Sequence, residues 1–345
     1  MCLQEKEERF KATLGFYHIQ WDGKKLVLLD QRKLPHEEAF VECQTAEDVA
    51  RAIKEMVVRG APAIGIVAAF GVVLEAKRAT SFEEINHRVQ KALEVLRKSR
   101  PTARNLFWAL ERIEGVMGEV DDPADVPVRL EEEALRIWQE DVEANLKIAK
   151  KGIELLPHGA RILTHCNAGG LATGGYGTAL GVIKEGYKCG KVQMVFATET
   201  RPLLQGARLT AWELRKEGIP VKLVSDSAVG YLMSKGMVDV VVVGADRITA
   251  RGDVANKVGT YVIAVLAKRH NIPFLVAAPL STFDFRLLFS DSIPIEERDQ
   301  REVLEFMGMR IAPEGVEAFN PAFDLTPAEL ITAIITEKEV LWPPL

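Results

Sequence analysis

The sequence predicts an α/β protein with a parallel, doubly wound sheet in its C-terminal part and a mainly helical N-terminal part. A small antiparallel β piece is expected in front of those helices. From about residue 160 onward, strand-like apolar runs alternate with helical stretches, the rhythm of βαβ units. One run, Val240–Val243, is apolar at every position, as expected of a strand buried on both faces. Between about residues 45 and 118, apolar residues recur at helical spacing.

The N-terminal part is expected to contain the β piece followed by helices. Residues Leu14–Leu34 alternate around a turn signal and predict a hairpin or a three-stranded antiparallel piece. Thr45, with acidic residues just after it, resembles a helix N-cap. Further helices are expected over Ala61–Lys77, Phe82–Lys98, Thr102–Met117 and Leu130–Leu155. Because Val120–Pro127 is rich in proline and acid, we expect one domain over 1–122 and a second over 123–345.

The C-terminal part is expected to alternate five strands with four helices. The strands are Arg161–Thr164, Val192–Ala197, Val221–Val224, Val238–Val243 and Phe274–Ala277. The helices are Tyr176–Lys184, Leu203–Lys216, Ala228–Lys235 and Val254–His270. Asn256 and Lys257 would then open the last helix, with Asp253 as its cap.

Composition excludes several classes of function. A net charge of -5 and a pI near 5.8 argue against a nucleic-acid-binding protein, which would need a basic face. Four scattered cysteines without CxxC spacing argue against structural zinc and favour a reducing, cytoplasmic location. The longest apolar run, Ala61–Leu74, is shorter than the ~20 residues that span a bilayer, and no signal peptide is visible. We therefore expect no metal, nucleic-acid or membrane partner.

Polar residues gather where the predicted strands end, and ligands of open parallel sheets bind beyond these ends. Cys166 follows one strand, and Asp246 follows another. The candidate positions are His165–Asn167, Glu199–Arg201, Asp226–Ser227, Asp246–Arg247 and Pro279. No second metal ligand stands at fixed spacing from His165, so we expect it to be packed or hydrogen-bonded instead.

Cys166 and Asp246 each allow two interpretations. A free cysteine is often a small buried hydrophobe, but a position before a glycine-rich helix start favours a thiolate or proton carrier. Asp246 could cap the next loop or pair with Arg247. In apolar surroundings it would instead stay protonated and suit general acid catalysis. The residues alone leave both alternatives open.

The glycine-rich segment 169–181 predicts a flexible loop at a helix start, where backbone N–H groups can hold an anion. It does not match G-x-G-x-x-G in register, and no P-loop is present. An NAD-linked dehydrogenase is therefore disfavoured, and a small phosphorylated substrate fits better. Arg59, Arg100 and Lys257 would suit such an anion, although each could instead be a solvated charge at a helix start.

A set of motifs, in order from about Leu29 to the C-terminus, resembles the methylthioribose-1-phosphate isomerase family, within the initiation-factor-2B α/β/δ-like proteins. These motifs are Arg59–Gly65, Ser99–Ala103, His165–Gly169, Glu199–Pro202, Gln205–Arg208, Gly244–Ile248, Gly252–Lys257 and Ala278–Asp284. The resemblance implies a Rossmann-like C-terminal domain, a homodimer, and no metal or organic cofactor. It implies that Cys166 and Asp246 are the catalytic pair. The substrate contacts that it implies are Arg59, Gly60, Ala61, Arg100, Gln205, Asn256 and Lys257.

The activity implied by this resemblance is aldose–ketose isomerisation of 5-methylthioribose 1-phosphate to 5-methylthioribulose 1-phosphate in methionine salvage, a route of methionine biosynthesis. Asp246 would act as general acid. Cys166 would either carry a proton or stabilise a direct hydride shift, and the sequence leaves both open. One alternative is an isomerase of another pentose 1-phosphate, either ribose 1,5-bisphosphate or 5-deoxyribose 1-phosphate. Another is a non-catalytic regulatory subunit of the translation-initiation exchange factor.

Overall fold

The computed structural model describes residues 17–100, 104–120, 122–290 and 293–345, and the chain divides into two compact units. Unit 1 runs to Lys147 and includes Ala168–Gly181, whereas unit 2 comprises Ile148–Asn167 and Val182–Leu345. The boundary between the units, after Lys147, falls within a helix. It differs from the domain boundary expected after residue 122, and that expected boundary stays a prediction. The starts of the predicted Leu14–Leu34 and Thr102–Met117 segments lie outside the described residues.

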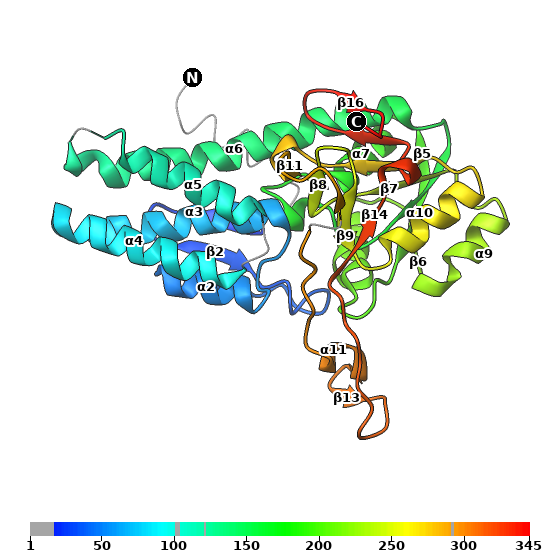
Figure 1. The fold of residues 1–345 in the computed structure, drawn as a ribbon, viewed down its shortest axis with the longest axis horizontal. Helices are drawn as coiled ribbons and strands as arrows, with labels where there is room; N and C mark the ends of the chain where they lie inside the picture. Colours follow the sequence, from blue (N-terminus) through cyan, green and yellow to red (C-terminus); the bar gives the residue numbers. More distant parts are fainter. Residues whose placement is uncertain (1–16, 101–103, 121, 291–292) are drawn as a thin grey trace. The chain divides into compact units, whose positions relative to one another are not determined.

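Unit 1 consists of a three-stranded antiparallel sheet and a group of helices (Figure 1). The strands are β1 (Ile19–Trp21), β2 (Leu26–Leu29) and β3 (Phe40–Cys43), the last later in the chain than expected. The helices are α2 (Ala46–Lys54), α3 (Ala61–Arg78), α4 (Phe82–Ser99), α5 (Arg104–Met117) and, after a turn at η1 (Pro123–Asp125), the first part of α6 (Val126–Gly152). The N-cap predicted at Thr45 is confirmed, because its side chain accepts a hydrogen bond from the backbone N–H of Asp48.

The core of unit 1 is centred on α3, which is apolar on every side. All of its residues from Ala61 to Ala76 except Pro62 are buried, and α2, α4 and α5 pack against it. The ring centroid of Phe70 lies 4.9 Å from that of Trp21 and 5.9 Å from that of Trp138. Within the described ranges, no helix combines the length and the apolar content needed to cross a bilayer.

Unit 2 is built on a seven-stranded sheet in the order β16-β15-β10-β7-β4-β5-β6. The strands are β4 (Ala160–Thr164), β5 (Val192–Thr198), β6 (Val221–Val224), β7 (Val240–Val243), β10 (Phe274–Ala277), β15 (Ala333–Ile335) and β16 (Val340–Leu341). All pairs are parallel except β15 with β16. The five predicted strands are therefore confirmed, and β15 and β16 were not predicted.

The order of the parallel strands reverses between β4 and β7. The chain moves outward from β4 through β5 to β6, then continues on the other side of β4 with β7, β10 and β15. The helices of this part are most of α7 (Ala179–Lys188), the π-helix η4 (Gly206–Thr210), α8 (Ala211–Lys216), α9 (Val229–Ser234) and α10 (Thr260–Arg269), with short turns at η2 (Ile153–Leu155) and η5 (Asp226–Ala228). The turn η3 (Gly170–Ala172) belongs to unit 1. Open sheets bind ligands at such a reversal.

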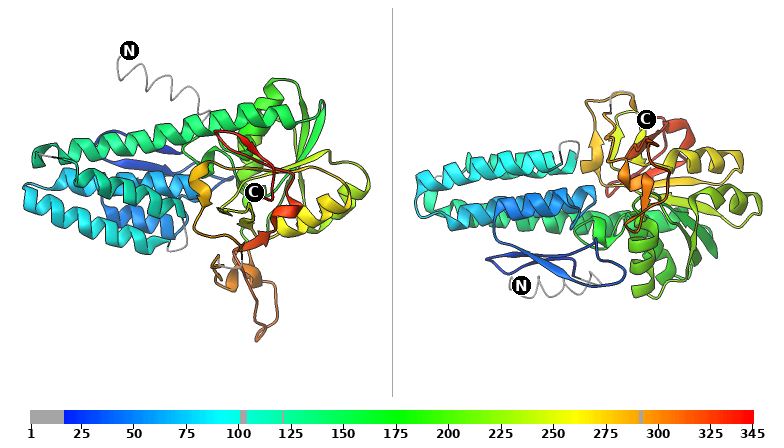
Figure 2. Two further views of the ribbon diagram at one scale, coloured as in Figure 1. Left: turned by 45° about the horizontal axis from the view of Figure 1, so that its top comes forward. Right: turned by 90° about the horizontal axis from the view of Figure 1, so that it is seen from below.

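Unit 2 also contains a four-stranded sheet and a projecting arm. The sheet has the order β11-β8-β9-β14, and its strands are β8 (Arg247–Thr249), β9 (Val254–Lys257), β11 (Phe283–Asp284) and β14 (Phe323–Thr326), with turns at η6 (Leu280–Thr282) and η8 (Ala328–Leu330). The arm, residues 293–322, contains α11 (Arg301–Leu304), β12 (Glu305–Phe306) and β13 (Met309–Arg310). Figure 1 and the left view of Figure 2 show it in orange, extending away from the two sheets of unit 2.

The helix predicted over Val254–His270 is wrong in its first part. Residues Val254–Lys257 form β9, which pairs with β8 on one side and β14 on the other, and α10 begins only at Thr260. These pairings involve strands distant in sequence, and they outweigh the local helical pattern. Nor does Asp253 cap the helix. Its carboxylate accepts hydrogen bonds from the backbone N–H groups of Ser290 (3.1 Å) and Ala328 (2.9 Å).

Replacing Phe70 with Ala is expected to lower the free energy of unfolding by about 3–5 kcal/mol, because a fully buried ring is lost and a cavity remains. Urea unfolding followed by tryptophan fluorescence measures this change. Phe40→Ala is the matched control, since Phe40 is 48% exposed and should cost less than about 0.5 kcal/mol. Equal stability of the two variants would contradict the central role of α3 in the core.

Candidate active site

Cys166 and Asp246 lie beyond the carboxyl ends of two neighbouring strands. Cys166 is the second residue after β4, and Asp246 is the third after β7. The two strands pair directly, with Ile162 opposite Val240 and Leu163 opposite Val241. The thiol and the carboxyl group therefore belong to loops that flank the reversal of strand order, where ligands of such sheets bind.

His165, just before the cysteine, is buried and bonded at both ring nitrogens. Nε2 lies 2.9 Å from the carbonyl oxygen of Val258, and Nδ1 lies 2.7 Å from Oγ1 of Thr198. A carbonyl can only accept, so Nε2 carries the proton and Nδ1 accepts from the threonine hydroxyl. Burial lowers the pKa of His165, which keeps the ring neutral. The expectation that His165 is a hydrogen-bonded neighbour is confirmed.

Asp246 lies at the base of the β8–β9 hairpin. Its backbone N–H donates to the carbonyl oxygen of Ala255 at 2.9 Å, and Arg247 stands opposite Ala255 in the register of the two strands. The hairpin therefore brings Asp246 beside the strand that carries Asn256 and Lys257. The guanidinium of Arg247 lies 3.9 Å from the carboxylate of Asp284.

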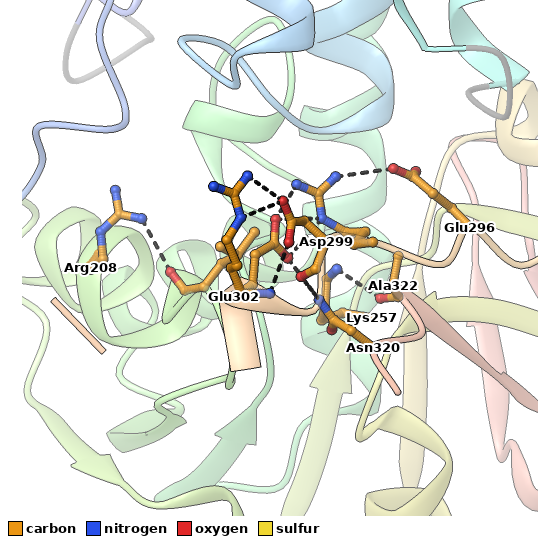
Figure 3. Close-up of polar contacts among 10 residues, drawn as sticks. Arg208, Lys257, Glu296, Asp299, Glu302, Asn320 and Ala322 are labelled. Carbon is orange, nitrogen blue, oxygen red and sulfur yellow. Dashed lines mark hydrogen bonds and ion pairs between the residues drawn. The ribbon is translucent and has the colours of Figure 1, made fainter. Parts of the chain in front are cut away.

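Lys257 is the last residue of β9, not the first-turn helix residue that was predicted. Its Nζ donates to the carbonyl oxygen of Ala322 at 2.7 Å (Figure 3). Nζ also lies 4.8 Å from the ring centroid of Phe323. Only 9% of the residue is exposed. Asn256, also buried, donates from Nδ2 to Oγ1 of Thr260 at 3.0 Å. Both side chains are thus ordered by the sheet and by the start of α10.

The base of the arm, near Ala322, is held by a small ionic network. Arg298 contacts Glu302 at 2.5 Å and Glu296 at 3.0 Å, and Asn320 donates to Glu302 at 3.0 Å (Figure 3). Arg298 is only partly exposed, so these charge-assisted bonds are stronger than bonds between neutral groups. The network fixes the chain that precedes β14.

Gln205 carries a polar atom without a protein partner. The residue follows β5, is 6% exposed, and its Oε1 has no hydrogen-bond partner among the residues that the structure describes. Buried polar atoms in native proteins are nearly always bonded to protein, water or ligand. Oε1 of Gln205 can therefore accept a hydrogen bond from a water molecule or a ligand.

The remaining predicted contacts, Arg59, Gly60, Ala61 and Arg100, belong to unit 1. Gly60 precedes α3, and Arg100 follows α4. These two helices have equal length, are joined by a short turn and pack together, so the two arginines lie at the same end of the pair. The N-terminus of α3 has no side-chain cap, which leaves backbone N–H groups for an anion.

Gly60 cannot be replaced by a larger residue without a backbone shift. Its φ is +96°, and a Cβ atom added there would lie 2.4 Å from the carbonyl oxygen of Ala172. The structure thus sets Gly60 directly against the glycine-rich segment, and both belong to unit 1.

The glycine-rich segment is not the open, flexible loop that was expected. Nearly all of it is buried, and side chains of unit 1 hold its backbone. Trp138 donates to the carbonyl oxygen of Gly174 at 2.6 Å, and the carboxylate of Asp141 accepts from the N–H of Gly174 at 2.6 Å. Two further side chains bind carbonyl oxygens of this segment. Nε2 of His18 lies 2.7 Å from the carbonyl oxygen of Thr173, and Nε2 of Gln31 donates to that of Leu171 at 2.8 Å.

Three residues near Cys166 were not among the predicted catalytic residues or substrate contacts. Thr200 and Thr210 bond its backbone, and Asp226 bonds Thr200. Thr200 and Asp226 follow strands β5 and β6, which is the signal that placed them among the polar strand ends. Nothing in the sequence marks Thr210, which lies at the end of the π-helix η4.

Asp324, on β14, has a carboxyl group with a raised pKa that accepts hydrogen bonds from the start of α10. It accepts hydrogen bonds from the backbone N–H groups of Gly259 (2.6 Å) and Tyr261 (3.1 Å). Burial raises its pKa to about 6, against the opposing effect of these bonds and of the charge on Lys257. Asp324 therefore titrates near neutrality, close to Asn256, which it faces in the β9–β14 register.

The contribution of Asp324 to stability is expected to fall as pH rises from about 4 to 6, because the folded protein keeps a proton on Asp324 that the unfolded chain releases. Asp324→Asn retains an acceptor oxygen and should remove about 1–2 kcal/mol of this decline. Urea unfolding of both proteins at several pH values measures the difference. Parallel stability curves for the two proteins would contradict the raised pKa.

The chain matches known proteins along almost its whole length. A family model described as the Initiation factor 2 subunit family matches residues 57–343. The methylthioribose-1-phosphate isomerase of Thermotoga neapolitana is 58% identical over 326 residues, covering 94% of this chain and 95% of that protein. The protein of the same name from Thermotoga maritima is 57% identical with the same coverage.

Solved structures show the same likeness. The crystal structure of 5-methylthioribose 1-phosphate isomerase from Pyrococcus horikoshii OT3 is 48% identical, with a TM-score of 0.90 over 95% of this chain and 92% of that one. A structure described as translation initiation factor eIF-2B, subunit delta, from A. fulgidus is 47% identical, with a TM-score of 0.85 over 95% and 96%. The chain therefore belongs to the Initiation factor 2 subunit family and, within it, to the methylthioribose-1-phosphate isomerases, which are aldose–ketose isomerases.

Proposed function

We propose that this protein converts 5-methylthioribose 1-phosphate to 5-methylthioribulose 1-phosphate in methionine salvage, with Asp246 and Cys166 as the catalytic pair. The observation that carries the proposal is the position of these two residues beyond paired strands at the reversal of strand order. The names of relatives up to 58% identical support the substrate. A cytoplasmic location, expected from the free thiols, and a Rossmann-like C-terminal domain belong to the same proposal.

The chemistry of the substrate explains the need for an acid. The anomeric oxygen is esterified to phosphate, so a free aldehyde cannot form by ordinary ring opening. Asp246, in its protonated form, donates to the ring oxygen while the bond from that oxygen to C1 breaks. The hairpin that fixes the backbone of Asp246 to Ala255 at 2.9 Å supports this role, because an acid must be held within reach of the atom that it protonates.

Two routes then move hydrogen from C2 to C1. In one, Cys166 removes a proton from C2, an enol forms between C1 and C2, and a proton is returned to C1 while the C2 hydroxyl becomes a ketone. In the other, hydride passes directly from C2 to the electron-poor C1, and the C2 hydroxyl loses its proton. Turnover in deuterated water distinguishes the routes, since deuterium at C1 of the product excludes a pure hydride shift.

The phosphate and hydroxyls of the substrate require cations and hydrogen-bonding groups. Arg59, Gly60, Ala61 and Arg100 are proposed contacts because the uncapped α3 N-terminus and the nearby guanidinium groups suit an anion. Gln205, Asn256 and Lys257 are proposed contacts on unit 2, and the orphaned Oε1 of Gln205 supports that assignment.

Cys166→Ser and Asp246→Asn are each expected to lower kcat by about 10²-fold or more, since each removes a group that transfers or stabilises charge. A coupled assay of ketose formation measures kcat and KM. Cys189→Ser and Asp239→Asn are matched controls. Cys189 is an exposed cysteine, and Asp239 precedes β7 at the end opposite Asp246. Parental rates in either active-site variant would refute the assigned pair.

The same assay separates the alternative functions. Faster turnover of ribose 1,5-bisphosphate or 5-deoxyribose 1-phosphate would assign a different pentose phosphate as substrate. Absence of turnover on all three sugars would favour a subunit of an assembly, the alternative that the likeness to the A. fulgidus structure supports.

We also propose a homodimer that uses the arm. Its hairpin region exposes six large apolar side chains, those of Phe306, Met307, Met309, Ile311, Val316 and Phe319. The exposed fraction reaches 79% at Met307 and 76% at Phe319. Clustered apolar exposure of this kind is unusual for a monomer and marks an interaction surface; a second copy of the chain is the simplest partner.

The double variant Met307→Lys/Met309→Lys is expected to shift the dimer to monomer at micromolar concentration, because two charges would have to be desolvated in the interface. Light scattering coupled to size-exclusion chromatography measures the mass. Tyr231→Lys, at a residue 65% exposed in α9, is the control and should remain dimeric. A monomeric parent protein, or a dimeric double variant, would contradict the proposed interface.

A further inference from the structure

The backbone of Cys166 is held in a left-handed conformation from two sides. Its φ is +60°, a region that non-glycine residues rarely occupy. Its N–H donates to Oγ1 of Thr200 at 2.9 Å, and its carbonyl oxygen accepts from Oγ1 of Thr210 at 2.6 Å. Both threonines are fully buried, so water does not compete for these bonds. Each backbone polar group of Cys166 is therefore fixed by a threonine hydroxyl.

Thr200 is itself held against its conformational preference. Its φ is +65°, although a β-branched residue rarely occupies this region. The carboxylate of Asp226 accepts from the N–H of Thr200 at 2.8 Å and from that of Arg201 at 2.7 Å. Strained conformations persist only where the surroundings over-determine them. The loop after β6 thus holds the loop after β5, which in turn holds Cys166 after β4.

The hydroxyl group of Thr200 makes hydrogen bonds that an apolar side chain at this position could not make. Because Oγ1 accepts from the N–H of Cys166, its own proton must be donated elsewhere. Two acceptors of Thr198 lie near Oγ1 of Thr200: Oγ1 of Thr198 at 3.2 Å and its carbonyl oxygen at 3.3 Å. Oγ1 of Thr198 is itself bonded to Nδ1 of His165. A valine at position 200 fills nearly the same volume but leaves the N–H of Cys166 without its acceptor.

Thr210 is placed by a second set of contacts. Its hydroxyl donates to the carbonyl oxygen of Cys166 and lies 3.2 Å from Nδ2 of Asn167, which also donates to the buried carboxylate of Glu213 at 2.8 Å. Thr210 ends a π-helix, an irregularity that is frequent at functional sites. Thr200 and Thr210 belong to one continuous segment after β5, in which the N–H of Leu204 donates to the carbonyl oxygen of Thr200 and the N–H of Arg208 to that of Leu204, each at 2.8 Å.

We propose that Thr200 and Thr210 are positioning residues for the thiol of Cys166, and that Asp226 holds Thr200 in place for this purpose. The left-handed conformation turns the Cα–Cβ bond of Cys166 away from the direction that an extended continuation of β4 would give. Loss of either hydroxyl lets the residue relax and displaces the thiol relative to the reacting carbons. The inference rests on the role of Cys166 proposed above.

The experiment compares Thr200→Val with Thr200→Ser, and Thr210→Val with Thr210→Ser. Each Val variant is expected to lower kcat by about 10- to 100-fold with KM changed less than about threefold, because displacement near 1 Å has effects of this size. Each Ser variant keeps the hydroxyl and should retain kcat within about threefold. Thr336→Val is the matched control, since Thr336 is fully buried and its hydroxyl donates to the carbonyl oxygen of Glu339. Thr336 directly follows β15, which β10 and β7 separate from β4 in the sheet.

Two readouts do not depend on turnover. Hydrogen–deuterium exchange of the peptide containing Cys166 should accelerate at least about tenfold in Thr200→Val and Asp226→Asn, but not in Thr336→Val. The pH profile of Cys166 alkylation, followed by mass spectrometry, should change in both Val variants and be restored in both Ser variants. If Thr200 and Thr210 had only a structural role, their Val variants would lose stability as Thr336→Val does. The pH profile of Cys166 alkylation would then not change.

The outcomes separate this inference from the proposed function. Unchanged exchange and alkylation in the Val variants, or equal loss of kcat in the Val and Ser variants, would overturn the positioning role. Full turnover by Cys166→Ser would instead refute the catalytic assignment of Cys166. Exchange and alkylation in the Thr200 and Thr210 variants would still report on the backbone contacts of Cys166. If Thr200→Val does not fold, the Thr210 pair and Asp226→Asn decide the question by the same measurements.

Discussion

The burial of the central strands of the parallel sheet, β7 and β10, on both faces governs where polar chemistry can occur in this protein. Strand β7 is fully buried along Val240–Val243, so a charged or nucleophilic side chain within it would lose its hydration without compensation. Such groups can be placed only beyond the strand ends. Because the strand order reverses between β4 and β7, the loops after these strands diverge there. The site is thus a consequence of the order of the strands as much as of the residues.

The sequence was sufficient for the parallel strands and for the polar character of their ends, because both are local patterns. Apolar runs bounded by polar residues predicted β4 and β7, and the cap at Thr45 needed only four neighbouring residues. That β4 and β7 are paired could not be read from periodicity, since pairing joins residues far apart in the chain. The same reason explains β9: its helix-like residues become a strand because β8 and β14 supply hydrogen bonds on both sides.

Bonds between a side chain on one loop and the backbone of the next recur throughout the site of unit 2. Asp226 bonds the backbone at Thr200, and Thr200 bonds the backbone of Cys166. His165 bonds the carbonyl of Val258, and Lys257 bonds that of Ala322. Loops joined in this way lose little further entropy on binding a ligand, which is the physical meaning of preorganisation. These pairings could not be predicted from the sequence, because no residue type indicates a partner 26 to 93 positions away.

The path of the chain between the two units has a consequence for biosynthesis. Unit 1 takes in Ala168–Gly181 after the first strand of unit 2 has been made. Until that segment emerges from the ribosome, the indole N–H of Trp138 and the carboxylate of Asp141 lack their glycine partners. The N-terminal unit therefore completes its core only after synthesis of the second has begun, and a fragment ending at Lys147 would be an incomplete fold. Neither unit is an independent module that could be exchanged by a single cut in the gene.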